Sequence, residues 1–132
     1  MNAMDNGPNS SKLEAGTHPF ADTPCDRLRA VQARIARAAA EAGRDVATVR
    51  LLAVSKTFDA AAVRAMAACG QHEFGENYLQ EALEKQATLS DLPLLWHFIG
   101  PIQSNKTRAI AGNFSWVHSL DRPHLAERLN RL

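Results

Sequence analysis

The sequence predicts an α/β protein built on a parallel sheet, and three observations support this fold class. Short apolar runs of strand length alternate with segments whose apolar residues are spaced three and four apart, as on one face of a helix. Runs such as residues 51–54 contain no polar residue, which is typical of strands covered on both faces. One leading helix followed by four strand–helix units implies a parallel sheet with right-handed crossovers.

The first elements are a leader and a helix. Residues 1–22 are rich in Asn, Gly, Pro, Ser and Asp, and we expect them to form a disordered leader. The first helix is expected to begin with Thr23 as N-cap and Pro24 in its first turn, and to end at Gly43. Its arginines indicate a solvated helix surface, because no aromatic residue is interleaved with them for stacking on RNA bases.

The four strand–helix units follow in order. Strands are predicted at residues 49–54, 72–74, 94–99 and 114–118. Helices are predicted from Asp59 to Gly70, over residues 78–89 and 104–111, and after Asp121 as N-cap.

This pattern fits either an open doubly wound sheet or half of a (β/α)₈ barrel. Eight units would need about 250 residues. The chain has 132 residues and stops inside a helix, so we expect it to be cut short at its C-terminus.

Composition limits the partners. The chain is 45% hydrophobic and 22% charged with a net charge of +1, which gives no reason to expect nucleic acid or an anionic membrane as the main partner. No apolar run approaches the roughly 20 residues that cross a bilayer. Cys25 and Cys69 have no metal-ligand spacing, and we expect two free thiols in a reducing compartment, the cytoplasm.

Polar residues follow the predicted strands. Lys56, Asn77, His97 and His118 lie at or near carboxyl ends of strands, the side of a parallel sheet where α/β folds bind ligands. Lys56 is a candidate Schiff-base amine, because a lysine at a partly apolar pocket loses ammonium solvation and its pKa falls. Asn77 can hydrogen-bond a ring hydroxyl or orient an imine without adding charge.

The same residues also have purely structural explanations. A lysine commonly ends a strand because it is well hydrated, and a histidine inside an apolar strand is more often a hydrogen-bonded core residue. A zinc site from His97, His118 and a carboxylate lacks the local spacing of a metal motif. The phosphate-binding glycine loops GxxxxGK[ST] and GxGxxG do not occur, so nucleotide binding by such loops is not supported.

Four sequence blocks carry a family resemblance. They are LAVSKT from Leu52, FGENY from Phe74, WHFIGPIQSNK from Trp96 and WVHSLD from Trp116. In this order and spacing they resemble the YggS/PROSC family of pyridoxal 5′-phosphate (PLP) homeostasis proteins. The resemblance extends from about Leu28 to Leu132.

The resemblance implies a fold, a cofactor and a function. Residues 23–132 would be the N-terminal part of a PLP-binding (β/α)₈ TIM barrel similar to the N-terminal domain of bacterial alanine racemase. PLP would be held as an aldimine of Lys56, with Asn77 beside it and His97 lining the same cavity. The family is thought to carry and buffer PLP, affecting vitamin B6 and amino-acid or keto-acid balance. It has no established turnover reaction, and PLP-dependent apo-enzymes are candidate recipients.

The chain departs from the family in length. Members of the family are longer, and the serine, glycine and arginine residues that grip the phosphate belong to their second half. We therefore expect these 132 residues alone to be poorly soluble or to pair with another copy, and to hold PLP weakly. The full-length protein is expected to be a monomer.

Two further functions remain open at this point. One is a PLP enzyme, such as a racemase or lyase, in which His97 or His118 moves a proton. The other is a non-catalytic α/β binding module in which Lys56 only forms a salt bridge.

Overall fold

A computed structural model describes residues 23–132. The predicted leader, residues 1–22, lies outside the described residues. The first described element is α2 (Pro24–Glu41), followed by the short 3₁₀ helix η1 (Val46–Thr48). The Thr23 hydroxyl accepts a hydrogen bond from the Asp26 amide, and Gly43 adopts φ +66° after the helix, so both predicted ends of α2 are confirmed.

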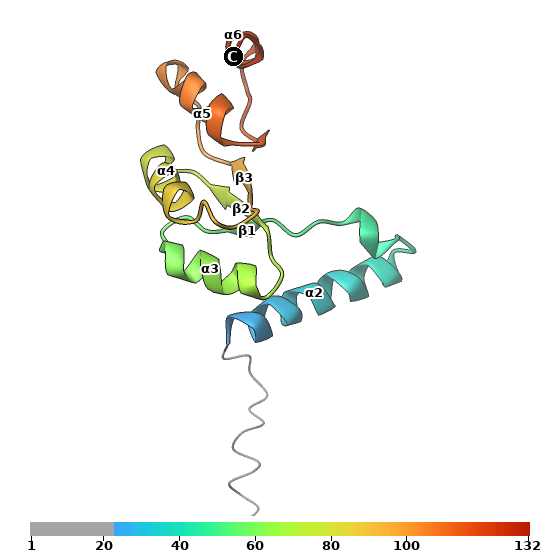
Figure 1. The fold of residues 1–132 in the computed structure, drawn as a ribbon. Coiled ribbons are helices and arrows are strands. Elements are labelled where there is room, and N and C mark those ends of the chain that lie inside the picture. Colours follow the sequence, from blue (N-terminus) through green and yellow to red (C-terminus); the bar gives the residue numbers. More distant parts are fainter. Residues whose placement is uncertain (1–22) are drawn as a thin grey trace, which may run out of the picture.

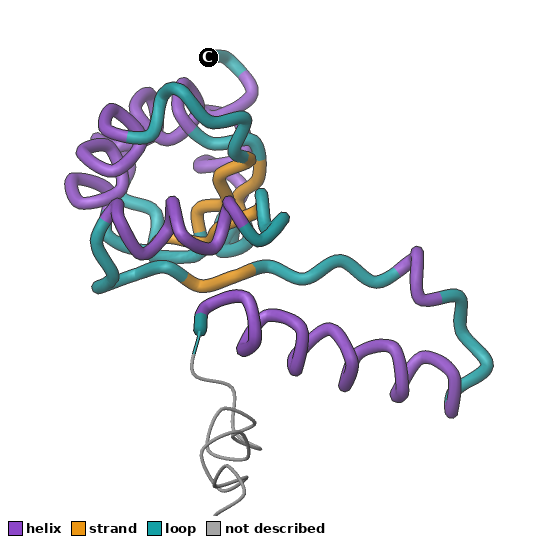
Figure 2. The backbone as a smooth tube through the Cα atoms, turned by 60° about the horizontal axis from the view of Figure 1, so that its bottom comes forward, coloured by secondary structure: helices purple, strands orange, loops and turns teal. Residues whose placement is uncertain are grey.

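Four βα units follow, as the sequence pattern predicts. The strands are β1 (Ala53–Val54), β2 (Glu73–Glu76), β3 (Leu95–Phe98) and β4 (Trp116–Val117). The helices are α3 (Ala60–Ala68), α4 (Leu79–Thr88), η2 (Ser104–Lys106) with α5 (Thr107–Asn113), and α6 (Pro123–Asn130). Figure 1 shows α3, α4, α5 and α6 following one another along the sheet, whereas α2 runs beside the extended segment that leads into β1. The same placement of α2 is visible in Figure 2.

The strands form one parallel sheet in the order β1-β2-β3-β4. Phe74 of β2 pairs with Ala53 and with Trp96, so these three residues share one face. This face carries the core. Phe74 and Trp96 pack with Val63 of α3 and Leu89, and a second cluster joins Phe98, Ile102, Ile110 and Leu125 under α5 and α6. We call this the helix face of the sheet.

The opposite face carries a row formed by Val54, Gly75, His97 and Trp116, which are paired across the four strands. We call it the open face. Val54 and Trp116 are 49% and 51% exposed, in contrast to the 1% of Phe74 on the helix face. The sheet described by residues 23–132 is therefore closed by helices on one side and leaves apolar side chains half-exposed on the other.

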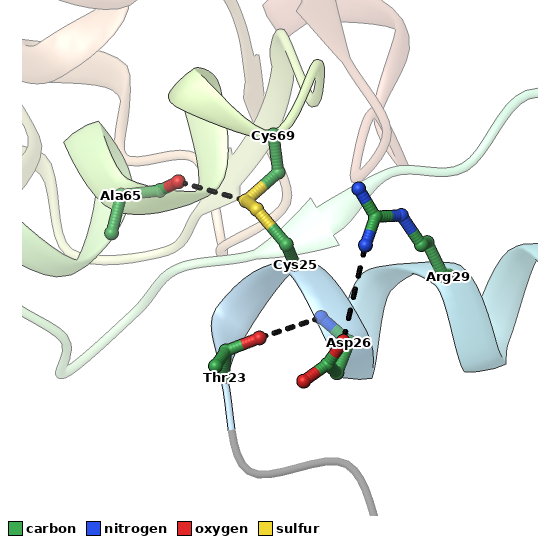
Figure 3. Close-up of a disulfide and its surroundings, with 6 residues drawn as sticks. All are labelled: Thr23, Cys25, Asp26, Arg29, Ala65 and Cys69. Carbon is green, nitrogen blue, oxygen red and sulfur yellow. Dashed lines mark hydrogen bonds and ion pairs between the residues drawn. A yellow bond between two sulfur atoms is a disulfide. The ribbon is translucent and has the colours of Figure 1, made fainter.

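The cysteine prediction is wrong. Cys25, in the first turn of α2, and Cys69, directly after α3, form a disulfide with their Cα atoms 5.2 Å apart (Figure 3). The two residues lie 44 positions apart in sequence. Their contact depends on how α2 packs against α3, which no local spacing could indicate.

Several predicted boundaries also shift. The first strand was predicted over residues 49–54, but only Ala53–Val54 pair with β2. Gly112 lies inside α5 instead of after it, and α6 begins after Arg122 instead of Asp121, whose carboxylate accepts from the Arg122 guanidinium. Among the described helices, none is both long and apolar enough to cross a membrane.

Candidate functional site

The predicted lysine lies in the turn between β1 and α3. Lys56 is exposed, and it follows Val54 of the open face by two residues. The next residue, Thr57, has φ +68°, in the left-handed region that non-glycine residues rarely occupy. This turn follows the end of β1, and Lys56 is exposed within it.

Asn77 leaves the neighbouring strand at the same level. It follows Gly75 by two residues, and Gly75 is paired with Val54, so Lys56 and Asn77 extend from adjacent strands at matching positions. Asn77 is half-buried, and its Oδ1 atom is buried without a hydrogen-bond partner among the described residues. An orphaned acceptor of this kind costs free energy unless a donor reaches it, so Asn77 Oδ1 is a candidate contact for a bound donor.

Gly100 holds the Asn77 loop in place from the next strand. A Cβ atom on Gly100 would lie 2.8 Å from both Cα and Cβ of Asn77 and closer still to its carbonyl oxygen. The Gly100 carbonyl in turn accepts a short hydrogen bond from the Ser119 hydroxyl. The loops after β2, β3 and β4 are thus in direct contact, and this contact requires a residue without a side chain at position 100.

His97 has both ring nitrogens engaged by the protein. Its Nδ1 lies 2.9 Å from Nε2 of His118, and its Nε2 lies 3.0 Å from a Glu73 carboxylate oxygen. Trp116 stacks on the His97 ring with an interplanar angle of 7°. His97 is 7% exposed, so it occupies a hydrogen-bonded, buried position, as in the structural alternative for this residue.

The histidine pair continues into a charged group. Arg50 donates two hydrogen bonds to Glu73, at 2.9 Å to Oε2 and 2.5 Å to Oε1, and Oε1 is also the oxygen that His97 contacts. Burial acts to raise the Glu73 pKa, but hydrogen bonds from Arg50 and His97 outweigh it and hold the pKa below its usual value. Arg50, Glu73, His97, His118 and Trp116, with two leucines, line a cavity of about 220 Å³.

A second charged cluster lies on the helix face behind Lys56. The Lys85 ammonium of α4 contacts the carboxylates of Glu76 at 2.6 Å and Glu81 at 2.8 Å, and it donates to the Ser55 carbonyl at 2.8 Å. Glu76 is fully buried, and its Oε2 atom has no partner among the described residues. Burial acts to lower the Lys85 pKa, but the hydrogen bonds that Lys85 donates to Glu76 and Glu81 outweigh it, so the pKa is raised and the ammonium stays protonated.

The sequence did not single out this second cluster. Glu81 and Lys85 have the i, i+4 spacing of an ordinary surface ion pair, and Glu76 directly precedes Asn77. The spacing of Glu81 and Lys85 and the position of Glu76 beside Asn77 are the two sequence features that could have drawn attention to these residues. Their burial follows from the packing of α4 over the end of β1, which the spacing alone does not show.

Comparison with known proteins identifies relatives of the whole arrangement. No protein-family profile matches the chain. The chain is 66% identical over 108 residues to the pyridoxal phosphate homeostasis protein of Pseudomonas aeruginosa, an alignment of 82% of this chain and 47% of the relative. It is 46% identical over 106 residues to the Escherichia coli K12 protein of the same name, covering 78% and 45%. The chain therefore spans about half the length of the curated relatives it matches.

Solved structures agree with the sequence comparison. PipY of Synechococcus elongatus, determined with PLP bound, matches with a TM-score of 0.64 and 50% identity over 74% of this chain and 46% of PipY. A protein of unknown function from Bifidobacterium adolescentis matches with a TM-score of 0.72 and 29% identity, over 86% of this chain and 53% of that protein.

Proposed function

Because the chain belongs to the family of pyridoxal phosphate homeostasis proteins, we propose that it binds PLP covalently at Lys56 and serves in PLP homeostasis. The chain covers about half of each relative, so the proposal concerns the part of the site that these residues build. When bound, PLP supplies an electrophilic aldehyde. Lys56 would hold the group through its amine, which would condense with that aldehyde with the loss of one water molecule.

One observation carries the proposal: Lys56 and Asn77 extend from adjacent parallel strands at the same level. The described residues fit the group. Lys56 is the accessible amine, and the orphaned Oδ1 of Asn77 is a buried acceptor that a ring hydroxyl or an imine proton could satisfy. His97 fits less directly because both its nitrogens are engaged, and we propose for it a role in shaping the cavity wall.

We further propose that residues 23–132 form the N-terminal part of a (β/α)₈ barrel. The strand order follows the chain order, every pairing is parallel, and α3 to α6 pack on the helix face only, as in a barrel wall. In such a barrel the open face would point to the interior, and Lys56 would lie at its carboxyl end.

The charge arrangement favours a carrier over an enzyme. Proton transfer on a bound substrate needs a side chain with a free acid or base atom at the reacting carbon. His97 uses both nitrogens within the protein, and His118 uses its Nε2 in the contact with His97. The Lys85 ammonium lies on the helix face with three acceptors around it. We therefore propose storage and release of PLP to PLP-dependent apo-enzymes as the role.

The test is a titration of the purified chain with PLP, followed by borohydride reduction and peptide mapping. We expect an absorption band that free PLP lacks, and a pyridoxyl group on the peptide containing Lys56. Lys106→Ala is the matched control, since Lys106 is another exposed lysine. The band should persist in Lys106→Ala and disappear in Lys56→Ala; its persistence in Lys56→Ala would refute the proposed attachment.

A further inference from the structure

We propose that Lys85, together with Glu76 and Glu81, is the positioning group that fixes the Lys56 turn for reaction. The inference rests on the proposed function, because it assigns a task to residues that do not touch the bound group. The cluster contacts both sequence neighbours of Lys56. Lys85 contacts Ser55, and Glu81 contacts Thr57.

The first contact holds the residue before Lys56. The Lys85 ammonium donates to the Ser55 carbonyl at 2.8 Å, and the Ser55 hydroxyl lies 3.1 Å from the Glu76 carboxylate. Ser55 directly follows β1, and its amide still donates to the Gly75 carbonyl of β2 at 3.0 Å. The main chain entering the turn is thus fixed from the sheet and from α4 together.

The second contact holds the residue after Lys56. The Thr57 amide donates to Glu81 Oε1 at 2.9 Å, and the same oxygen accepts from Lys85. Thr57 has the unfavourable φ of +68°, which persists only where the surroundings impose it. The Glu81 carboxylate is the group that captures the Thr57 amide in this conformation, and Lys85 holds that carboxylate in place.

The geometry needs an ammonium group at position 85. Three acceptor oxygens lie within 2.8 Å of the Lys85 Nζ atom, in the Ser55 carbonyl and the carboxylates of Glu76 and Glu81, which matches the three donors of an ammonium group. Lys85 is 5% exposed, so water cannot replace a lost partner. This cluster lies on the helix face, and Lys56 is exposed in the turn beyond it, so its effect on Lys56 is transmitted through the turn's main chain.

The experiment compares Glu81→Ala with Glu81→Gln, which keeps an acceptor for the Thr57 amide, and with Glu84→Ala. Glu84 is exposed on the same helix, and its hydrogen bonds are with Gln80 and Thr88 instead of with the main chain of the turn. Lys85→Met is the direct variant, but it leaves the buried Glu76 carboxylate without its ion-pair partner and so endangers folding. Glu81→Ala changes a more exposed residue of the cluster, so it still tests the inference if Lys85→Met does not fold.

Two readouts are needed. Amide hydrogen exchange of the peptide containing residues 55–58 reports on the turn without any ligand. In Glu81→Ala we expect exchange about tenfold faster there and unchanged in β3, as for the loss of one charge-assisted hydrogen bond. The second readout is the ratio of pyridoxyl label on Lys56 to label on Lys106 after borohydride trapping. We expect this ratio to fall about tenfold in Glu81→Ala, less in Glu81→Gln, and not in Glu84→Ala.

The outcomes separate this inference from the proposed function. If the wild-type chain carries no more pyridoxyl label on Lys56 than on Lys106, the proposed attachment is wrong. Hydrogen exchange of residues 55–58 then remains the test of whether the cluster fixes the turn. Faster exchange with an unchanged labelling ratio means that the cluster is merely structural and overturns its positioning role. Unchanged exchange in Glu81→Ala overturns the inference altogether.

Discussion

Glu73 is the residue on which the open face's charged group depends, because its carboxylate accepts two hydrogen bonds from Arg50 and also contacts His97. We predict that Glu73→Gln lowers the free energy of unfolding by about 1 to 2 kcal/mol at neutral pH, as for the loss of hydrogen bonds to a charged group. The measurement is urea denaturation of both proteins.

The effect should depend on pH in a defined direction. Burial raises the Glu73 pKa and the hydrogen bonds from Arg50 and His97 lower it by more, so the folded-state pKa is depressed. A depressed pKa gives stability that is present above the unfolded-state value of about 4.3 and is lost as the pH falls through the folded-state value. The difference between wild type and Glu73→Gln should therefore shrink below about pH 4. An equal difference at pH 7 and at acid pH would contradict this account.

Gly100 is the second residue with a testable consequence. We predict that Gly100→Ala displaces the Asn77 loop, since its Cβ would lie 2.8 Å from Asn77 Cα, and that PLP binding weakens by about tenfold or more. Gly112→Ala is the control. It lies within α5 with no atom within 4 Å of its added Cβ, so it should be neutral or stabilise by up to about 1 kcal/mol. Equal PLP affinities for the two variants would show that Gly100 does not contribute to the site.

Sequence alone could place the residues at strand ends, because the position of a polar residue after an apolar run is a local property. Lys56 and Asn77 were predicted in this way, and both lie where their strands end. The burial of Lys85 could not be predicted, because an i, i+4 ion pair has the same pattern whether its helix faces water or a strand end.

At the scale of elements, α2 is attached to α3 by the Cys25–Cys69 disulfide shown in Figure 3. We predict that Cys69→Ser, or reduction of the wild type, lowers the free energy of unfolding by about 2 to 4 kcal/mol, because the link closes a long loop in the unfolded chain. Denaturant titration with and without a thiol reductant measures the change. A reductant that destabilises Cys69→Ser as much as the wild type would show that the loss does not come from this disulfide.

Element order and type were predictable from the sequence, whereas strand limits were not. Residues 49–52 contain three β-prone or apolar residues, Val49, Leu51 and Leu52, around Arg50, yet only Ala53 and Val54 reach the register of β2. The preceding η1 turns the chain outward beside α2, so these residues lack a partner strand among the described residues. Pairing is a tertiary property, and composition indicates only that a segment is able to pair.

At the scale of the whole molecule, the sheet has two edges and one half-exposed face. Val54 and Trp116 lie on the open face, and they belong to the edge strands β1 and β4. We predict that this chain of 132 residues self-associates in a concentration-dependent way, because unpaired edges and exposed apolar side chains favour contact with another copy.

Sedimentation velocity over a range of concentrations measures the association. Trp116→Ser should weaken it, while Val46→Ser, which removes an apolar residue of similar exposure from η1 outside the sheet, should not. A single sedimenting species of monomer mass at all concentrations would contradict the prediction.

The consecutive strand order has a consequence for how the molecule is made. Each strand pairs with the strand that precedes it along the chain, so no pairing waits for a distant segment. Because only a short stretch of chain separates each pair of neighbouring strands, the entropic cost of bringing them together is small. We therefore expect the units to dock one after another as the polypeptide leaves the ribosome. Nascent chains ending after α4 should already resist protease between β1 and β2; cleavage there until β4 has emerged would indicate assembly only after release.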